Sequence, residues 1–324
     1  MTKVALGIDI GGTNTDFAFV DRHGKFLAGD RVSTKNFLDV EVFVAALMEK
    51  ASLTKIRYGK ELDIIGIGIG APMGNINKGT IEQSADLPWK GVIPLADLIK
   101  NHINLPVLVT NDANAAAVGE MVYGGAQGMK NFVVITLGTG LGSGFVVDGK
   151  LLYGQDGFAG EVGHTIVRPG RTNRECGCGR RGCLETYVSA TGITRTLSKL
   201  LADSIKPSEL RDFSPNELTS LHISEAALAG DELALLAFEH TGEMLGIKLA
   251  DVAAHTNPEA IFLFGGLALS KGLIFEPTKK HFEKNLLSIY RNRVKLLPSQ
   301  LNSKNSAVLG ASALAWDTFE NGKK

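Results

Sequence analysis

The chain has 324 residues, and its 34 basic and 34 acidic side chains leave a formal net charge of zero. This balance gives no support for a general nucleic-acid or membrane surface, so we expect neither partner. No stretch approaches the roughly 20 apolar residues of a membrane span, and the first residues, MTKVALGIDIGG, lack the blocks of a signal peptide. We therefore expect a cytoplasmic protein, a setting in which structural disulfides are rare.

Apolar strands and amphipathic helices alternate along the chain, which is typical of the α/β class. Strands are predicted at residues 4–10, 16–20, 25–28, 64–70, 107–110, 131–136, 143–147, 150–153, 260–264 and 294–297. Helices are predicted at residues 38–52, 95–102, 113–123, 190–201, 223–228, 232–254, 275–285 and 307–319. A polar segment with two prolines, residues 204–221, is expected at the surface.

The pattern of the first strands returns in the middle of the chain. Each copy, VALGIDIGGTNTDFAFVDRHGKFL and FVVITLGTGLGSGFVVDGKLL, is a strand, a glycine-rich turn, a strand, a glycine turn and a strand. The copies begin about 127 residues apart, which indicates two related lobes and not a short-period repeat array. We expect a smaller lobe formed by residues 1–112 and 303–324, and a larger lobe formed by residues 113–302.

Both copies carry a glycine-rich turn after their first strand, at residues 9–15 and 137–142. Such turns place several backbone N–H groups on one concave face, which suits phosphate oxygens. Neither is a Walker loop or a dinucleotide fingerprint, because no G-K-[ST] follows and each turn leads into a strand. One such turn alone is more often a tight hairpin, but the pair favours phosphate binding. The expected phosphate contacts are Gly11, Gly12, Thr13, Asn14, Gly138, Thr139 and Gly140.

Three further features lie at strand ends. Asp9 precedes the first turn and could anchor Mg²⁺, directly or through water. Gly265 and Gly266 form either a plain strand-to-helix turn or a bare surface for a flat adenosine. Asn111 and Asp112 lie between a strand and a helix, where Asp is a favoured N-cap but where ligands also bind in α/β folds. A carboxylate there can orient a substrate hydroxyl and accept its proton during phosphoryl transfer.

All three cysteines lie within eight residues, at Cys176, Cys178 and Cys183. With His164 they form H-x₁₁-C-x-C-x₄-C, and Cys₃His is a closed, four-coordinate set for structural zinc. Free or redox-active thiols are the alternative, and a disulfide would leave one thiol over. The glycines that permit tight turns between these ligands are Gly177, Gly179 and Gly182.

The chain resembles the ROK family of sugar kinases and repressors. The stretches that carry the resemblance are DIGGTNT (9–15), GIGAPM (68–73), LPVLVTNDANAAAVGE (105–120), LGTGLGSGFVVDGKLLYGQDGFAGEVGH (137–164), CGCGRRGCLE (176–185) and FGG (264–266). They occur in order over nearly the whole chain. The resemblance implies an actin-like (ribonuclease H-like) two-lobed ATPase fold, with ATP in an interlobe active-site cleft and a homodimeric assembly.

The resemblance also implies roles for individual residues. Asp112 is the implied catalytic base. Asp86 departs from the family pattern, in which many members carry Asn before the Leu, and the carboxylate loses the two donors of the amide. If one nitrogen of His164 binds zinc, the other is held to meet a sugar hydroxyl. The implied sugar contacts are Asn111, Asp112, Glu161, His164 and Glu185, with Asp86 as a further candidate.

We therefore expect an ATP-dependent kinase that phosphorylates a hexose at the 6-hydroxyl, with glucose as the first candidate. An N-acetylmannosamine, N-acetylglucosamine or fructose kinase is the alternative within the class. A catalytically silent, sugar-binding regulator is the alternative outside it. The intact Asp112 and both glycine turns count against a regulator, and the first turn at Asp9 leaves no room for the helix-turn-helix of the family's repressors.

Overall fold

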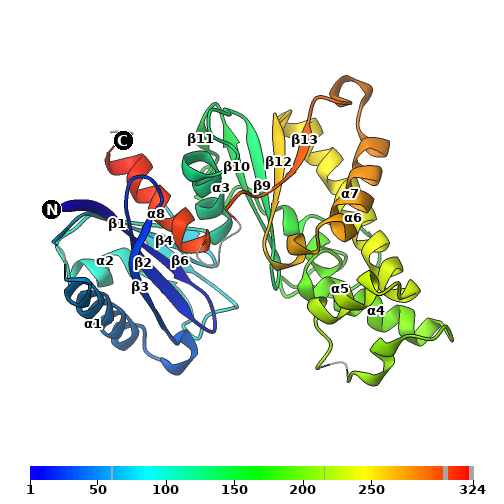
Figure 1. Ribbon diagram of the computed structural model, residues 1–324, viewed down its shortest axis with the longest axis horizontal. Coiled ribbons are helices and arrows are strands. Elements are labelled where there is room, and N and C mark those ends of the chain that lie inside the picture. The colour runs from blue at the N-terminus through cyan, green and yellow to red at the C-terminus, as the bar shows by residue number, and fades with distance from the viewer. Residues whose placement is uncertain (60, 215, 302–305, 321–324) are drawn as a thin grey trace. The chain divides into compact units, whose positions relative to one another are not determined.

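The computed structural model describes residues 1–59, 61–214, 216–301 and 306–320 (Figure 1). The chain divides into two compact units. The first comprises Met1–Met129, Gly144–Gly160 and Ser299–Lys324, and the second comprises Lys130–Ser143 and Glu161–Pro298.

This division differs from the lobes expected from the sequence. Residues 113–129 and 144–160 group with the first unit and not with the second. The reason is the helix after residue 111, which packs against the last helix of the chain and the first sheet. The expected boundary between residues 302 and 303 lies outside the described residues.

A five-stranded sheet forms the centre of the first unit, with the strand order β3-β2-β1-β4-β8. Strands β1, β2 and β3 pair antiparallel, whereas β4 and β8 extend the sheet in parallel with β1. A smaller sheet has the order β5-β6-β7. The bounds are β1 Thr2–Ile10, β2 Thr15–Val20, β3 Phe26–Val32, β4 Leu62–Gly70, β5 Gly74–Asn75, β6 Thr80–Glu82, β7 Val92–Ile93 and β8 Val107–Thr110.

The second large sheet has the same plan, with the order β11-β10-β9-β12-β13. Strands β10 and β11 pair antiparallel, and β12 pairs in parallel with both β9 and β13. The sequence repeat thus corresponds to a repeated sheet. The bounds are β9 Phe132–Leu137, β10 Leu141–Val147, β11 Lys150–Leu151, β12 Ala260–Phe264 and β13 Lys295–Pro298.

Eight α-helices and six 3₁₀ segments lie within the described residues. The α-helices are α1 Val40–Tyr58, α2 Leu95–Lys100, α3 Asp112–Tyr123, α4 Ala190–Asp203, α5 Ser220–Leu228, α6 Glu232–Thr256, α7 Gly272–Asn285 and α8 Ser306–Phe319. The 3₁₀ segments are η1 Thr34–Asn36, η2 Val162–His164, η3 Leu184–Thr186, η4 Glu209–Asp212, η5 Gly266–Ser270 and η6 Ser288–Tyr290. The alternation of strands and helices confirms the α/β class.

Helix α1 runs six residues beyond its predicted end at Ser52. Asp39 caps its start, because its side chain accepts the backbone N–H groups of Glu41 and Val42. Gly59 ends it in the left-handed region, with φ at 71°. The polar segment 204–221 is not wholly at the surface, since Leu210 is buried.

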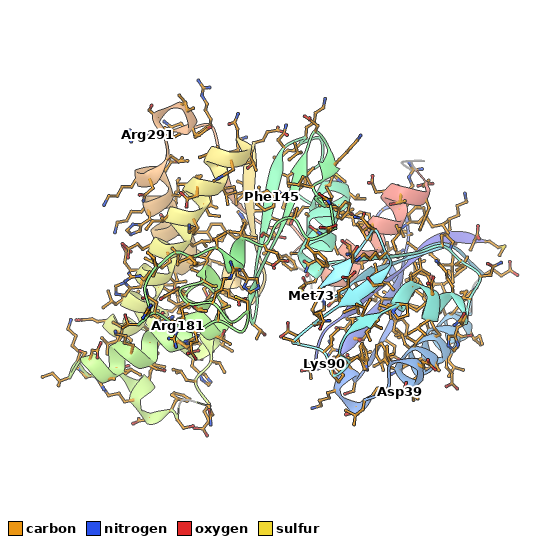
Figure 2. The ribbon with its side chains drawn as sticks, turned by 180° about the vertical axis from the view of Figure 1, so that it is seen from behind. Asp39, Met73, Lys90, Phe145, Arg181 and Arg291 are labelled. Carbon is orange, nitrogen blue, oxygen red and sulfur yellow. The ribbon has the colours of Figure 1, made fainter. Side chains whose placement is uncertain are left out.

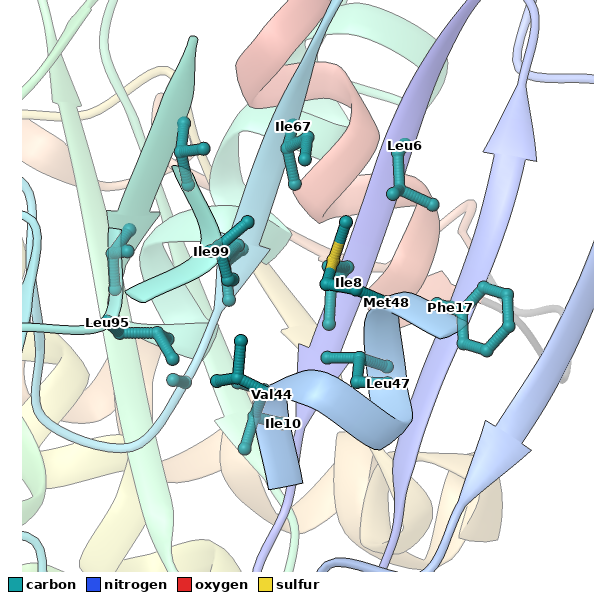
Figure 3. Packing of buried hydrophobic residues seen from close by; sticks show 14 of the residues in the cluster. Leu6, Ile8, Ile10, Phe17, Val44, Leu47, Met48, Ile67, Leu95 and Ile99 are labelled. Atoms are coloured by element: carbon teal, nitrogen blue, oxygen red, sulfur yellow. The ribbon is translucent and has the colours of Figure 1, made fainter. Parts of the chain in front are cut away.

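Helices α1 and α2 cover one face of the first sheet, and α3 and α8 approach the other. Figure 3 shows Leu6, Ile8 and Ile10 of β1 packed against Val44 and Leu47 of α1. All five side chains are almost fully buried. Each contributes roughly 1.5–3 kcal/mol through burial of apolar surface.

The opposite face of the same strands carries few large side chains. A Cβ on Gly7 of β1 would lie 2.4 Å from the carbonyl oxygen of Val308, and one on Gly68 of β4 would lie 1.9 Å from that of Ala311. Real Cβ atoms do not approach oxygen so closely, so these positions require glycine. The alternating glycines of β4 therefore let the backbone of α8 lie directly on the sheet.

We predict that Gly68→Ala destabilises the first unit by about 3 kcal/mol or more, because the added methyl meets the rigid backbone of α8. Thermal unfolding followed by circular dichroism measures the change. The matched control is Gly272→Ala at the exposed start of α7, where the nearest atom to an added Cβ is 4.0 Å away. Equal unfolding midpoints for the two variants would contradict the tight packing of α8.

Candidate functional site

Two carboxylates meet at one edge of the first sheet. Strands β1, β4 and β8 run in parallel, so their carboxyl ends share this edge, where ligands bind in many α/β proteins. Asp9 lies near the end of β1, and Asp112 begins α3 directly after β8. Gly70 ends β4 between them, because its Cβ position lies 3.5 Å from Cα of Asp112 and 3.8 Å from Oδ1 of Asp9.

The N-cap of α3 is Asn111 and not Asp112. Oδ1 of Asn111 accepts the N–H of Ala113 at 2.9 Å, and Oδ1 of Asp112 accepts the same N–H at 2.8 Å. The sequence leaves Asp112 open as either an N-cap or a ligand contact, and the cap position is taken by Asn111. Because the amide caps the helix, the aspartate is not required for that role and its side chain lies exposed to solvent.

The pKa values of both carboxylates are raised. The pKa of Asp9 is raised to about 7, first by burial and then by the carboxylates of Asp112 and Asp16. Asp16 lies opposite Asp9 in the hairpin and accepts two hydrogen bonds from Arg31, at 2.6 and 2.9 Å. Desolvation, and to a smaller extent the Asp86 carboxylate, raises the pKa of Asp112. A small molecule can still reach Asp112, although the surrounding protein displaces much of its bulk water.

The first glycine turn joins β1 to β2 beside these carboxylates. The N–H of Gly11 donates to the carbonyl oxygen of Asn14 at 3.0 Å and closes the turn. Among the described hydrogen bonds, the N–H groups of Gly12 and Thr13 have no protein acceptor, so they can meet a phosphate oxygen. A Cβ on Gly12 would lie 2.2 Å from the carbonyl oxygen of Asp86, which places exposed Asp86 against this turn.

The second glycine turn lies in the second unit between β9 and β10. The N–H of Gly138 donates to the carbonyl oxygen of Gly140 at 3.1 Å, and the start of α4 holds the turn through Ala190 N–H to Gly138 O at 2.8 Å. Residues 138–140 are exposed. Gly265 follows β12 with φ at 100°, and its Cβ position lies 2.7 Å from the carbonyl oxygen of Leu137. The glycine pair at 265–266 therefore lies beside the second turn and leads into η5, not directly into an α-helix.

Three thiols and one imidazole converge in the loop before α4. The ligand atoms of His164, Cys176, Cys178 and Cys183 all lie within 4.8 Å of one another. The Sγ atoms of Cys178 and Cys183 are 3.7 Å apart, and Sγ of Cys176 lies 3.5 Å from Nδ1 of His164. Tetrahedral zinc with thiolate ligands would separate sulfur atoms by about 3.8 Å, so the four residues fit such an ion. None of the three cysteines forms a disulfide.

The loop is shaped for these ligands. Gly179 and Gly182 have φ values of 83° and 79°, whereas Gly177 is not in the left-handed region. A Cβ on Gly182 would lie 1.9 Å from the carbonyl oxygen of Arg168. Burial opposes ionisation of Cys178, but hydrogen bonds from Arg180 and the neighbouring thiols outweigh it and lower the pKa of Cys178 to about 6. A thiolate is therefore favoured at Cys178, whereas burial raises the pKa values of Cys176 and Cys183.

The imidazole of His164 has two different surroundings. Its Nδ1 atom faces the thiols, whereas its Nε2 atom lies 4.0 Å from Oε2 of Glu161. Glu185 stands next to the cluster, since Oε1 accepts from Sγ of Cys176 at 2.9 Å. The other oxygen, Oε2, lies 3.0 Å from the Cβ position of Gly140. The thiol cluster, Glu185 and the second glycine turn are thus one connected group in the second unit.

The structure therefore brings the expected site residues together as two groups, one in each unit. The first holds Asp9, Gly11, Gly12, Thr13, Asn14, Asp86, Asn111 and Asp112, and the second holds Gly138, Thr139, Gly140, Glu161, His164, Cys176, Cys178, Cys183, Glu185, Gly265 and Gly266.

Two charged residues whose hydrogen bonds hold the backbone around these groups were not predicted from the sequence. Arg174 stacks over the ring of Tyr187 and donates to the carbonyl oxygens of Thr186 (2.6 Å) and Gly192 (3.0 Å), which ties the thiol loop to α4. Glu120 is fully buried and accepts the N–H groups of Gly125 and Gln300, at 2.8 and 3.1 Å. The available signal for Glu120 was its position as a charged residue inside an otherwise apolar stretch. Arg174 lies among other arginines, so no sequence signal distinguished it.

Comparison with known proteins agrees with this arrangement. The ROK family model matches residues 5–318. The chain belongs to the ROK family. It is 36% identical to the glucokinase of Halalkalibacterium halodurans over 282 residues, which is 86% of this chain and 84% of that protein.

Other ROK members extend the comparison. The crystal structure of a ROK family glucokinase from Streptomyces griseus, in complex with glucose and AMPPNP, has a TM-score of 0.80 and 33% identity, covering 96% of this chain and 98% of that one. The xylose repressor of Caldicellulosiruptor bescii is 32% identical over 253 residues, which is 78% of this chain and 62% of the repressor. These neighbours confirm the actin-like fold. None of the described helices is long and apolar enough to cross a membrane.

We predict that the stability of the ligand-free protein depends on the charge of Asp9. The folded-state pKa of about 7 exceeds the ordinary value of 3.8, so the folded state binds more protons between about pH 4 and 7. Stability from this group is therefore lost as pH rises through that window. Asp9→Asn, which carries no charge, should show a smaller fall of the unfolding midpoint between pH 5 and 8 without Mg²⁺ or nucleotide. Exposed Asp203→Asn is the control, and a parallel fall in wild type and Asp9→Asn would contradict the prediction.

Proposed function

We infer that the chain is an ATP-dependent sugar kinase that phosphorylates glucose. The observation that carries this inference is the exposed Asp112 carboxylate, set at a strand end beside Asp9 and the first glycine turn. Similarity to glucokinases supports ATP as donor and glucose as acceptor. Transfer to the 6-hydroxyl and the roles of single residues are parts of this proposal.

Asp112 acts as the base in the proposed reaction. Its carboxylate accepts the proton of the sugar hydroxyl as the new O–P bond forms, and the bond between the γ-phosphorus and its bridging oxygen breaks to release ADP. The loose transition state does not demand a strong base, but the raised pKa of Asp112 makes its carboxylate a better proton acceptor. The rate should therefore fall as acid protonates this group.

The two glycine turns hold the phosphates of ATP. Each offers backbone N–H groups without protein acceptors among the described residues, in a form suited to phosphate oxygens. Gly265 and Gly266 leave room beside the second turn for the adenosine. Asp9 fits a role as the Mg²⁺ anchor, because a desolvated carboxylate next to other carboxylates is stabilised by a cation. Bound Mg²⁺ would neutralise the phosphate charge.

Sugar recognition uses acceptors and donors from both groups. Oδ1 of Asn111 is engaged by the helix N–H, so its amide NH₂ is the part that can donate to a sugar oxygen. Glu161, Glu185 and Nε2 of His164 supply the second group's contacts. Asp86 can only accept, so it suits a hydroxyl that donates.

The thiol cluster binds structural zinc in this proposal. Four protein ligands leave no open position for a reacting water, so the metal would fix the loop and not take part in bond breaking. Zinc at Nδ1 of His164 would set the tautomer and aim Nε2 at the sugar. Glu185, two residues past Cys183, would be aimed by the same loop.

Two alternatives remain distinguishable. An N-acetylhexosamine or fructose kinase would share the same base and turns and differ only in the sugar pocket. A sugar-responsive regulator is favoured by the similarity to a xylose repressor, but it would not need Asp112 or both glycine turns.

We also propose a homodimer acting in the cytoplasm, which sedimentation and cell fractionation would test.

We predict that Asp112→Asn loses about 10²–10⁴-fold in kcat, because the amide cannot accept the hydroxyl proton. Glucose binding, measured by calorimetry, should change little, since the amide keeps one acceptor oxygen. The control is Asp63→Asn, because Asp63 lies near the start of β4, at the end opposite to Gly70 and the candidate site. Near-normal turnover of Asp112→Asn would refute the base assignment.

We predict about one zinc per chain in protein purified without chelators. Cys178→Ala should lose the metal and raise the glucose KM roughly 10-fold, because His164 and Glu185 lose their alignment, while the ATP KM stays within about twofold. Metal analysis and steady-state kinetics test both points. A folded, zinc-free Cys178→Ala with an unchanged glucose KM would contradict the role of the metal.

A further inference from the structure

A loop of the first unit, residues 83–91, carries Asp86 between β6 and β7. Its base is closed by the N–H of Gln83, which donates to the carbonyl oxygen of Gly91 at 2.8 Å. The side chains of Leu87 and Trp89 are buried and anchor one side of the loop in the core. The indole of Trp89 packs 4.7 Å from the ring of Phe43.

Residues 84–87 of this loop form no strand or helix. Three of its carbonyl oxygens lie around the ammonium of Lys90, the residue labelled in Figure 2. Nζ donates to the carbonyl oxygens of Ser84 at 3.3 Å, Ala85 at 3.5 Å and Leu87 at 3.0 Å. An ammonium has three N–H donors and no acceptor, so three carbonyl oxygens match its full capacity.

This arrangement is unusual for a lysine of an exposed loop. Other lysines of the first unit pair with carboxylates. Nζ of Lys100 lies 3.3 Å from Oδ1 of Asp97, and Nζ of Lys50 lies 3.0 Å from Oδ1 of Asp30. Lys90 forms no ion pair among the described residues. Its ammonium donates instead to backbone carbonyl oxygens of its own loop. Hydrogen bonds to a charged donor are stronger than neutral ones, so the three contacts of the ammonium favour this shape of residues 84–87.

The held segment touches the candidate site at two points. The carbonyl oxygen of Asp86 lies 2.2 Å from where a Cβ of Gly12 would be, so the loop can lie against the first glycine turn only because residue 12 has no side chain. The carboxylate of Asp86 also acts on Asp112, whose pKa it raises. A change in the loop would therefore move Asp86 relative to both.

We propose that Lys90 is a positioning residue of the sugar site: its ammonium holds residues 84–87 so that Asp86 stands beside Asp112 and Gly12. Lys90 itself touches neither sugar nor ATP and acts through Asp86. This inference rests on the proposed function, because it treats Asp86 as a sugar contact. In this role the ammonium of Lys90 is the hydrogen-bond donor for backbone carbonyl groups that no strand or helix pairs.

The test compares Lys90→Met, which keeps the stem and removes the donors, with Lys100→Met as the matched surface control. Glucose Kd is measured by calorimetry without nucleotide, and kcat and both KM values by steady-state kinetics. We expect Lys90→Met to raise the glucose Kd and KM roughly 10-fold, with a smaller change in ATP KM and an unfolding midpoint close to that of the control. A glucose Kd within about twofold of wild type would overturn the proposal.

A double-variant cycle separates positioning from general support of the fold. If Lys90 acts through Asp86, adding Lys90→Met to Asp86→Ala should weaken glucose binding by less than about twofold. A full additive loss would overturn the proposed route. If Lys90→Met does not fold, Lys90→Gln replaces it in both comparisons, since its shorter, neutral amide has only two N–H donors for the three carbonyl oxygens. That variant should bind glucose at least about threefold more weakly, and wild-type binding would overturn the proposal.

The outcome also distinguishes this inference from the function on which it rests. A wild-type protein that does not bind glucose would overturn both. A wild type that binds and phosphorylates glucose, together with a Lys90→Met variant that binds it equally well, would overturn the role of Lys90 alone.

Discussion

The candidate active site depends on the direct contact between bare glycine backbone and helix backbone in the first unit. Gly68 and Gly7 let α8 lie against the sheet, and Gly70 leaves space for the start of α3. Only this close approach puts Asp112 beside Asp9, since a single methyl group on β4 would push the helices outward. The same strands bury large apolar side chains on their other face, so α1 and α2 supply the hydrophobic stabilisation that the glycine face lacks.

The two units apply one design to different tasks. In each, a parallel sheet edge carries a hairpin turn rich in glycine, and the turn is closed by its own backbone. The first unit adds carboxylates whose ionisation is disfavoured, and the second adds a thiol and imidazole cluster that could hold a metal. The carboxylates and the thiol cluster thus lie on separate elements. Rigid support behind them comes from buried or backbone-bound ions such as Glu120, Arg174 and Lys90.

Most of the fold could be predicted because its signals are local. Apolar runs, turn glycines and the repeated hairpin indicate the strands and their order, and the Cys₃His spacing indicates the metal cluster. Helix α1 was underestimated because its last turns are polar and only Gly59 marks the end. The cap of α3 could not be assigned to one residue from the sequence, because Asn and Asp are both good caps and adjacent positions differ only in the geometry of the backbone.

The remaining features depend on tertiary contacts that no local pattern reports. The glycines of β4 were visible as an alternation, but their reason is the backbone of α8, more than 200 residues later. Lys90 looks like any lysine of an exposed loop until three carbonyl oxygens are seen around it. The raised pKa of Asp9 arises first from burial, then from Asp112 at the start of a helix about a hundred residues away, and then from Asp16 on the paired strand.

The central claim is that the Asp9 and Asp112 edge of the first unit serves phosphoryl transfer from ATP to glucose. The most direct measurement is kcat/KM with ATP for glucose, mannose, fructose, N-acetylmannosamine and N-acetylglucosamine, with the product of each identified. The account predicts the highest value for glucose and glucose 6-phosphate as its product. Preference for an N-acetylated sugar or fructose would contradict the substrate assignment, and absence of turnover with all five sugars would contradict the claim itself.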